Sequence, residues 1–301
     1  MNSNDGGDAM GNTALKEECT IQLKDGRLIG YAEYGDPLGT PIFYFHGFPG
    51  SRLEAGRYHD VAIKNHFRLI GIDRPGMGLS SIDPERTVLS WANDVAEFAD
   101  CLGIKTFSII GHSGGGPLVA ACAYAIPERL NGAAIVSGMG PLAMPESRIG
   151  MAFNQKISIF LIHWMPWLAP SMMKLTRNMV NNPKMLEKMI KQLPEVDQVL
   201  MRDPELLKSF LGGVNEAFRN GVEGPAQEMK LLDNSSKSWG FELENIQYPV
   251  AIWHGTVDAQ APVSHARIYA RLIPNATLRI IENEGHLSLI HHYFSEILGG
   301  N

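Results

Sequence analysis

The chain has 301 residues, of which 45% are hydrophobic, so it is long enough to bury one large core. Its formal net charge is −6 and no basic block stands out, which argues against nucleic acid as a partner. The three cysteines, Cys19, Cys101 and Cys122, form no CxxC pair, so they predict free thiols and neither a disulfide framework nor a zinc site. We therefore expect a globular protein in a reducing compartment.

Residues 1–18 have neither the basic segment nor the apolar stretch of a signal peptide, and we interpret them as a disordered leader. With the cysteine pattern, this predicts a cytoplasmic protein. The apolar run from Ile157 to Met173 is shorter than the roughly 18 to 20 residues of a membrane span, and Pro166 and Pro170 interrupt it. We expect a buried or cap-forming helix pair there and no membrane span, with a weak interfacial helix as the alternative.

The first part of the folded chain alternates between strands and helices. A hairpin with its turn at Asp25-Gly26 comes first, and apolar strands and polar-faced helices follow it. In order, the predicted segments are the hairpin 20–36, strands 40–47 and 66–76, helix 90–101, strand 107–113, a helix of small residues, and strand 132–138. Short, nearly continuous apolar strands are typical of a parallel sheet that helices cover on both faces.

This alternation stops between residues 141 and 238, where the pattern indicates helices only and methionines are frequent. It resumes with a strand at 248–255 and ends with a helix after Gly285. We predict an α/β core made of residues 19–140 and 239–301, with a helical cap, residues 141–238, inserted into it.

The strongest chemical signal is the run Gly111-His112-Ser113-Gly114-Gly115, between a predicted strand and a predicted helix. A tight strand–turn–helix corner needs small neighbours and lifts the central hydroxyl clear of the sheet. Ser113 is therefore the candidate nucleophile.

A serine hydroxyl needs a base, and the carboxyl ends of parallel strands are where such groups gather. His286 follows the last predicted strand in the sequence Gly285-His286-Leu287, whereas His112 and His254 are interpreted as structural. Asp258 follows the preceding strand and is the candidate acid that orients the base. The order Ser113, Asp258, His286 is the order in which such groups occur on sheets of this kind.

The negative oxygen formed on attack requires preorganised donors. The loop His46-Gly47-Phe48-Pro49-Gly50 follows the strand at 40–47, so its Phe48 N–H is one candidate donor. The N–H of Gly114 is the second. Asp73 and Arg74, in a glycine-rich loop, are interpreted as stabilising that loop and not as catalytic.

With these motifs in order, the chain resembles the α/β-hydrolase superfamily, as a capped, serine esterase-like member, over about residues 20–298. The resemblance implies an eight-stranded, mostly parallel sheet with helices on both faces and a helical cap over the site. It implies a serine hydrolase that cleaves a small carboxylic ester or lactone through an acyl-enzyme, without a metal or organic cofactor. Ser113 argues against epoxide hydrolases and dehalogenases, which carry Asp at that position.

Three alternatives stay open: amide or peptide cleavage of the proline iminopeptidase type, carbon–carbon bond cleavage, and a non-catalytic ligand-binding role. The first requires cap acids to hold the substrate amine, for which Glu146, Glu216 and Glu223 are candidates. Large apolar cap residues could line the substrate pocket or, if exposed, drive association, so both a monomer and a homodimer are compatible with the sequence. The candidate pocket residues are Phe153, Phe160, Trp164, Trp167 and Phe218.

Overall fold

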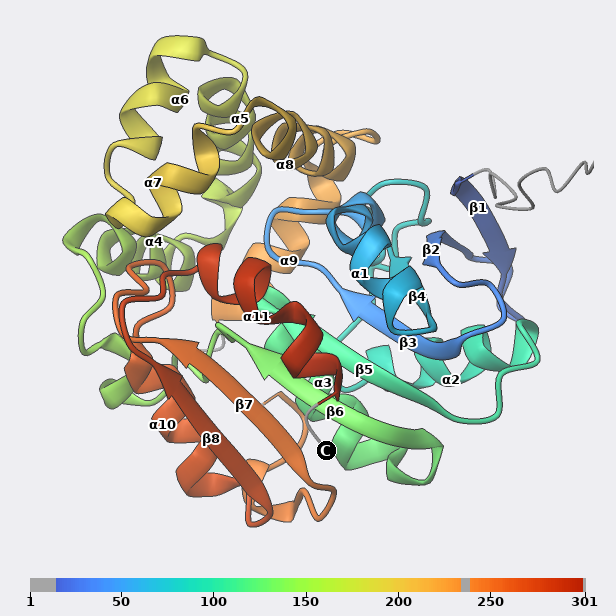
Figure 1. Ribbon diagram of the computed structural model, residues 1–301. Helices are drawn as coiled ribbons and strands as arrows, with labels where there is room; N and C mark the ends of the chain where they lie inside the picture. Colours follow the sequence, from blue (N-terminus) through green and yellow to red (C-terminus); the bar gives the residue numbers. More distant parts are fainter. Residues whose placement is uncertain (1–14, 234–238, 300–301) are drawn as a thin grey trace, which may run out of the picture.

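The computed structural model describes residues 15–233 and 239–299, which form one eight-stranded sheet with helices around it (Figure 1). The strand order is β1-β2-β4-β3-β5-β6-β7-β8; β2 is antiparallel to β1 and β4, and the other neighbours are parallel. The strands are β1 (Lys16–Gln22), β2 (Leu28–Gly35), β3 (Thr40–Phe45), β4 (Phe67–Ile72), β5 (Phe107–His112), β6 (Leu130–Val136), β7 (Val250–Gly255) and β8 (Ala276–Ile281). This confirms the predicted fold class.

The predicted hairpin is β1 paired with β2, closed by the turn around Gly26. β1 begins at Lys16, so the last three residues of the predicted 1–18 leader belong to the sheet and not to a disordered segment. Residues 1–14 lie outside the described part of the chain.

Helices cover both faces of the sheet because its central strands bury side chains on both sides. In β3, Ile42 and Tyr44 belong to one core cluster, whereas Phe43 and Phe45 belong to the other. This alternation explains why the central strands have no polar face in the sequence. The core helices are α1 (His59–Lys64), α2 (Trp91–Cys101), α3 (Gly116–Ala125), α10 (Val263–Leu272) and α11 (Ser288–Gly299), with a 3₁₀ helix η1 at Arg52–Tyr58.

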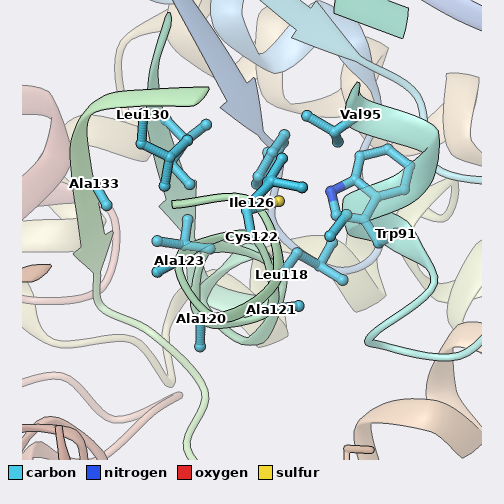
Figure 2. Packing of buried hydrophobic residues seen from close by; sticks show 14 of the residues in the cluster. Trp91, Val95, Leu118, Ala120, Ala121, Cys122, Ala123, Ile126, Leu130 and Ala133 are labelled. Atoms are coloured by element: carbon cyan, nitrogen blue, oxygen red, sulfur yellow. The ribbon is translucent and has the colours of Figure 1, made fainter. Parts of the chain in front are cut away.

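The larger core cluster lies where α2 and α3 pack on the sheet (Figure 2). Trp91 and Val95 of α2 face Leu118 and Cys122 of α3, and α3 contributes mostly small residues. Small side chains allow α3 to approach the sheet closely. The N-terminus of α3, which follows the Ser113 corner, is thereby fixed against the core.

The insertion between β6 and β7 is helical, as predicted. In Figure 1, α4 to α8 gather at the upper left of the molecule, and α9 leads back to the core. The inserted helices are α4 (Phe153–Trp164), α5 (Ala169–Val180), α6 (Pro183–Ile190), α7 (Glu195–Met201), α8 (Pro204–Ala217) and α9 (Glu223–Asp233), with short 3₁₀ turns such as η5 (Pro166–Leu168). Residues 234–238, at the end of the predicted cap, lie outside the described residues. None of the described helices is long and apolar enough to cross a membrane.

Buried ion pairs join the insertion to the core. Glu228 of α9 is fully buried and contacts both Arg74 and Arg86 of the loops that follow β4. Glu216 of α8 pairs with the buried Arg52 at 2.6 Å, and Arg52 also pairs with Asp73 at 2.8 Å. A buried charge without a partner would lower the free energy of unfolding. These ion pairs therefore hold α8 and α9 against η1 and the loops that follow β4.

Candidate active site

Ser113 lies at the corner between β5 and α3, in the conformation that the glycine pattern predicts. Its φ of 54° is rare for a residue with a side chain. A Cβ on Gly111 would lie 2.4 Å from the carbonyl oxygen of Gly115, and one on Gly115 would lie 2.3 Å from that of Phe45. The glycines two residues before and two after Ser113 are therefore required sterically. The corner leaves Ser113 partly exposed at the carboxyl end of β5.

His286 and Asp258 are brought together from the loops after β8 and β7. Asp258 Oδ2 is 2.8 Å from His286 Nδ1, and Asp258 Oδ1 accepts the backbone N–H groups of Gln260 and Ala261. Burial would lower the pKa of His286, but the charge of Asp258, with smaller contributions from Asp197 and Glu54, raises it above the ordinary 6.5. Burial likewise would raise the pKa of Asp258, yet its contacts with His286 lower it below 3.8. Both directions favour a charged His286–Asp258 pair.

The loop after β3 places the Phe48 backbone beside Gly114. A Cβ built on Gly114 would lie 3.6 Å from the Phe48 nitrogen, and one on Gly47 would lie 3.5 Å from Ser113 Cβ. Within residues 15–233 and 239–299, neither the Phe48 N–H nor the Gly114 N–H has a protein acceptor. Two unpaired donors thus lie next to the Ser113 corner. Arg74 holds the loop after β3 by donating to the carbonyls of His46 and Gly47.

Glu54, a residue that no sequence motif indicated, connects the loop after β3 to His112, the residue before Ser113. Its carboxylate accepts hydrogen bonds from the Tyr44 hydroxyl at 2.7 Å and the Gly47 N–H at 3.1 Å, and it contacts His112 Nδ1 at 2.8 Å. Burial would raise the pKa of Glu54, but the His112 contact and nearby positive charges lower it. The other ring nitrogen of His112 is 3.1 Å from the His286 carbonyl oxygen. His112 is thus a structural link between Glu54 and the backbone of His286.

Asp197 of α7 is a second site residue that the sequence did not reveal. It is fully buried, and its carboxylate accepts the backbone N–H groups of His286 (2.9 Å), Leu287 (3.1 Å) and Ser288 (2.9 Å) at the start of α11. A Cβ on Gly285 would lie 2.4 Å from Asp197 Oδ2, so this glycine makes room for the carboxylate. A negative charge at a helix N-terminus is stabilising. Asp197, which belongs to the inserted helices, in this way fixes the core loop that carries His286.

Two apolar cavities adjoin these groups. One, of about 200 Å³, reaches Phe48 and Leu232 near Gly114; the other, of about 350 Å³, reaches Leu287 beside His286. Ser113 is not among the lining residues of either cavity. Asn154, Gln155 and Gln260 belong to both linings and lie between them. Each cavity also has three methionines in its lining: Met139, Met151 and Met229 in the first, and Met179, Met189 and Met201 in the second.

The five predicted pocket residues do not line these cavities. Phe153, Phe160, Trp164 and Trp167 are 60 to 79% exposed, and Phe218 is buried in the cap's own core. The pattern of α4 explains the difference, because both of its faces are apolar and the inner one carries Ser158, Ile159 and Ile162. These inner residues, together with Asn154 and Gln155 and not the aromatic ones, form the α4 wall of the smaller cavity.

The remaining candidates have other partners. Glu146 pairs with Arg271 at the surface, Glu216 with Arg52 and Arg219, and Glu223 accepts the Val222 N–H. His254 is buried and 2.6 Å from the carbonyl oxygen of Ala261, consistent with a structural role. Among the described residues, no group of three or more His, Cys, Asp or Glu side chains could hold a metal ion.

Asp197 provides a test of this geometry. Asp197→Ala should lower the free energy of unfolding by about 2–5 kcal/mol, because three buried N–H groups lose a charged acceptor. Asp197→Asn keeps one acceptor oxygen and should be destabilised less. Urea unfolding monitored by circular dichroism measures both, and Glu195→Gln, an exposed change on the same helix, is the control. An Asp197→Ala protein as stable as this control would contradict the anchoring role.

Comparisons with known proteins agree with this architecture. Residues 40–293 match the model of the alpha/beta hydrolase fold family. The chain is 26% identical over 278 residues to a non-heme chloroperoxidase of Streptomyces lividans, covering 91% of this chain and 94% of that protein. It is 27% identical to a poly(3-hydroxyalkanoate) depolymerase of Ectopseudomonas oleovorans, covering 90% and 86%.

Some curated relatives are longer, and the chain spans 62% and 63% of the length of two of them. Among solved structures, an esterase from Exiguobacterium antarcticum superposes with a TM-score of 0.66 at 19% identity, covering 94% of this chain and 98% of that one. At that identity the superposition shows the fold alone. Since the family model spans most of the sequence, the chain belongs to the α/β-hydrolase fold family.

Proposed function

We propose that the protein is a serine hydrolase that cleaves a carboxylic ester or lactone through an acyl-enzyme. The observation that carries this proposal is the His286–Asp258 hydrogen bond next to the strained Ser113 corner. Donation from Nδ1 to Asp258 leaves Nε2 of the neutral imidazole as an acceptor. The ring of His286 lies 4.9 Å from that of His112, the residue before Ser113, which supports His286 as the base for Ser113.

In this mechanism Ser113 Oγ attacks the substrate carbonyl carbon while His286 Nε2 takes the hydroxyl proton. The carbonyl oxygen becomes an oxyanion, which the free N–H groups of Phe48 and Gly114 stabilise. The carbon–oxygen bond to the leaving alcohol then breaks, and His286 gives its proton to the alkoxide. A water molecule, deprotonated by His286, then attacks the acyl carbonyl carbon. The bond from this carbon to Ser113 Oγ breaks, and His286 returns the proton to Ser113 as the acid leaves. In a lactone the alcohol stays attached to the acyl group, so one product forms.

The cavities supply a place for each half of an ester. The smaller one reaches Phe48 and so adjoins the proposed oxyanion donors, which suits the acyl group. The larger one reaches Leu287 and so adjoins the base, which must protonate the leaving alcohol. Methionines in both walls can adapt to apolar groups of different shape, which favours a broad range of apolar esters.

Amide cleavage and carbon–carbon bond cleavage use the same three groups, so they stay as alternatives within this proposal. The iminopeptidase alternative is less well supported, because Glu146 and Glu216 are engaged with arginines and Glu223 with backbone. A purely ligand-binding role requires neither the charged His286–Asp258 pair nor the two free N–H donors, so these groups favour catalysis.

Ser113→Ala should reduce hydrolysis of a panel of p-nitrophenyl esters by at least about 1,000-fold, because the acyl-enzyme cannot form. Ser137→Ala is the matched control, since Ser137 also has a positive φ, at the end of the neighbouring strand β6. Amino-acid anilides measured beside the esters separate amide from ester cleavage. Activity of Ser113→Ala within about tenfold of the wild type would rule out the nucleophile assignment.

The pH dependence follows from the raised pKa of His286. Because the base must be neutral, kcat/KM should rise with pH through an inflection above 6.5. Asp197→Asn removes one of the charges that raise this pKa, so its inflection should move to lower pH, while Glu195→Gln should leave it in place. Initial rates from pH 5 to 9 give both profiles. An inflection that stays fixed in Asp197→Asn would show that Asp197 does not act on the base.

A further inference from the structure

The outer face of α4 carries an exposed apolar stripe. Phe153, Ile157, Phe160 and Trp164 are spaced four, three and four residues apart, so they share one face of a helix with 3.6 residues per turn. Trp167 of η5 follows, and the five side chains are 42 to 79% exposed. We call these five residues the outer stripe. Large aromatic groups in such a continuous exposed row mark an interaction surface.

The chain segment that contains the outer stripe carries only basic charges. From Ser147 to Leu186 the chain has no Asp or Glu, although the whole chain has 32 acidic residues and a net charge of −6. The same segment carries five exposed cations, none of which forms an ion pair with a described residue: Arg148, Lys156, Lys174, Arg177 and Lys184. Exposed aromatic residues within a basic segment are favoured at the interface of an anionic membrane.

We propose that the outer stripe docks the cap onto an anionic lipid surface. Tryptophan and phenylalanine would enter the boundary between headgroups and acyl chains, and the lysines and arginines would face the negative headgroups. A second copy of the chain fits less well, because a two-fold contact would set this basic segment against itself. The docking would be peripheral, since no described helix is long and apolar enough to span a bilayer.

Helix α4 lies between the outer stripe and the smaller cavity. Its inner residues Ser158, Ile159 and Ile162 line the smaller cavity, while its outer residues would contact lipid. One helix therefore separates the proposed membrane surface from the proposed acyl site. Docking itself does not depend on the proposed hydrolysis, because it requires only the outer stripe and the cations.

The test is co-sedimentation of the full chain with vesicles of phosphatidylcholine containing phosphatidylglycerol, and with vesicles of phosphatidylcholine alone. The wild type should bind the anionic vesicles and bind the neutral ones much more weakly. Trp164→Ser/Trp167→Ser should weaken binding by about tenfold or more, because two apolar anchors are lost. Leu38→Ser, which removes an exposed apolar side chain (95% exposed) ahead of β3, should leave it unchanged.

Two further variants test the charges and separate docking from chemistry. Lys156→Glu/Lys174→Glu should weaken anionic binding, whereas Lys64→Glu/Lys105→Glu, with the same change of net charge on the core, should weaken it less. Ser113→Ala should bind as the wild type does, so loss of hydrolysis and loss of docking are told apart. Thermal unfolding confirms that each variant is folded.

Tryptophan fluorescence provides a direct readout. Trp164 and Trp167 are the exposed tryptophans, whereas Trp91, Trp239 and Trp253 are buried. Anionic vesicles should therefore shift the emission to the blue, and the shift should vanish in the double serine variant. Absence of wild-type binding, or equal binding of the stripe variant, would overturn the proposal. So would a dimer in light scattering that the stripe variant dissociates while no vesicle binding occurs, since that would identify a second copy as the occupant.

Discussion

The buried carboxylate of Glu54 is the contact on which the geometry of the candidate site depends. It joins the loop after β3, through the Gly47 N–H, to His112 at the end of β5, and His112 in turn contacts the carbonyl of His286. A carboxylate without water is tolerated only when its oxygens are fully hydrogen-bonded. Its partners are therefore held in one arrangement, and the free N–H donors, Ser113 and His286 are fixed relative to one another by the same group.

The cap takes part in this arrangement and does not simply cover it. Asp197 of α7 binds three N–H groups of the loop that carries His286, and Gln155 of α4 donates to the carbonyls of Ala259 and Gln260 beside Asp258. Glu216 and Glu228 pair with buried arginines of the core. The cap thus acts on His286 electrostatically as well as sterically, because the charge of Asp197 helps to raise the pKa of His286. Sequence changes in the cap can in this way alter both the cavities and the pKa of His286.

The sheet, its hairpin and the Ser113 corner could be predicted because their constraints are local. Glycines at fixed distances from Ser113 reflect a turn that closes within a few residues, and continuous apolar strands reflect burial on both faces. The pairing of Asp258 with His286 was predictable as well, since carboxyl ends of neighbouring strands meet at one edge. The structure brings these two side chains together as the sequence analysis expected, while their catalytic roles remain part of the proposal.

Glu54 and Asp197 could not be predicted, because their contacts span 58 and 89 residues along the chain and no local pattern records them. The aromatic residues of α4 were assigned to the pocket for a related reason. Periodicity shows which residues share a face of a helix, but it does not show which of two apolar faces points inward. The Ile159 face is inside and the Phe160 face is outside, and only the packing of α4 against the rest of the fold decides this.

Covalent labelling tests most directly whether Ser113 is an activated nucleophile. A fluorophosphonate probe should react with the native protein, lose fluoride and leave one phosphonyl group on the Ser113 oxygen, which peptide mass spectrometry locates. Labelling should slow greatly in Asp258→Asn, where His286 loses its charged partner, and should be absent in Ser113→Ala. A folded wild-type protein that gains no adduct, or gains it on another residue, would contradict the account.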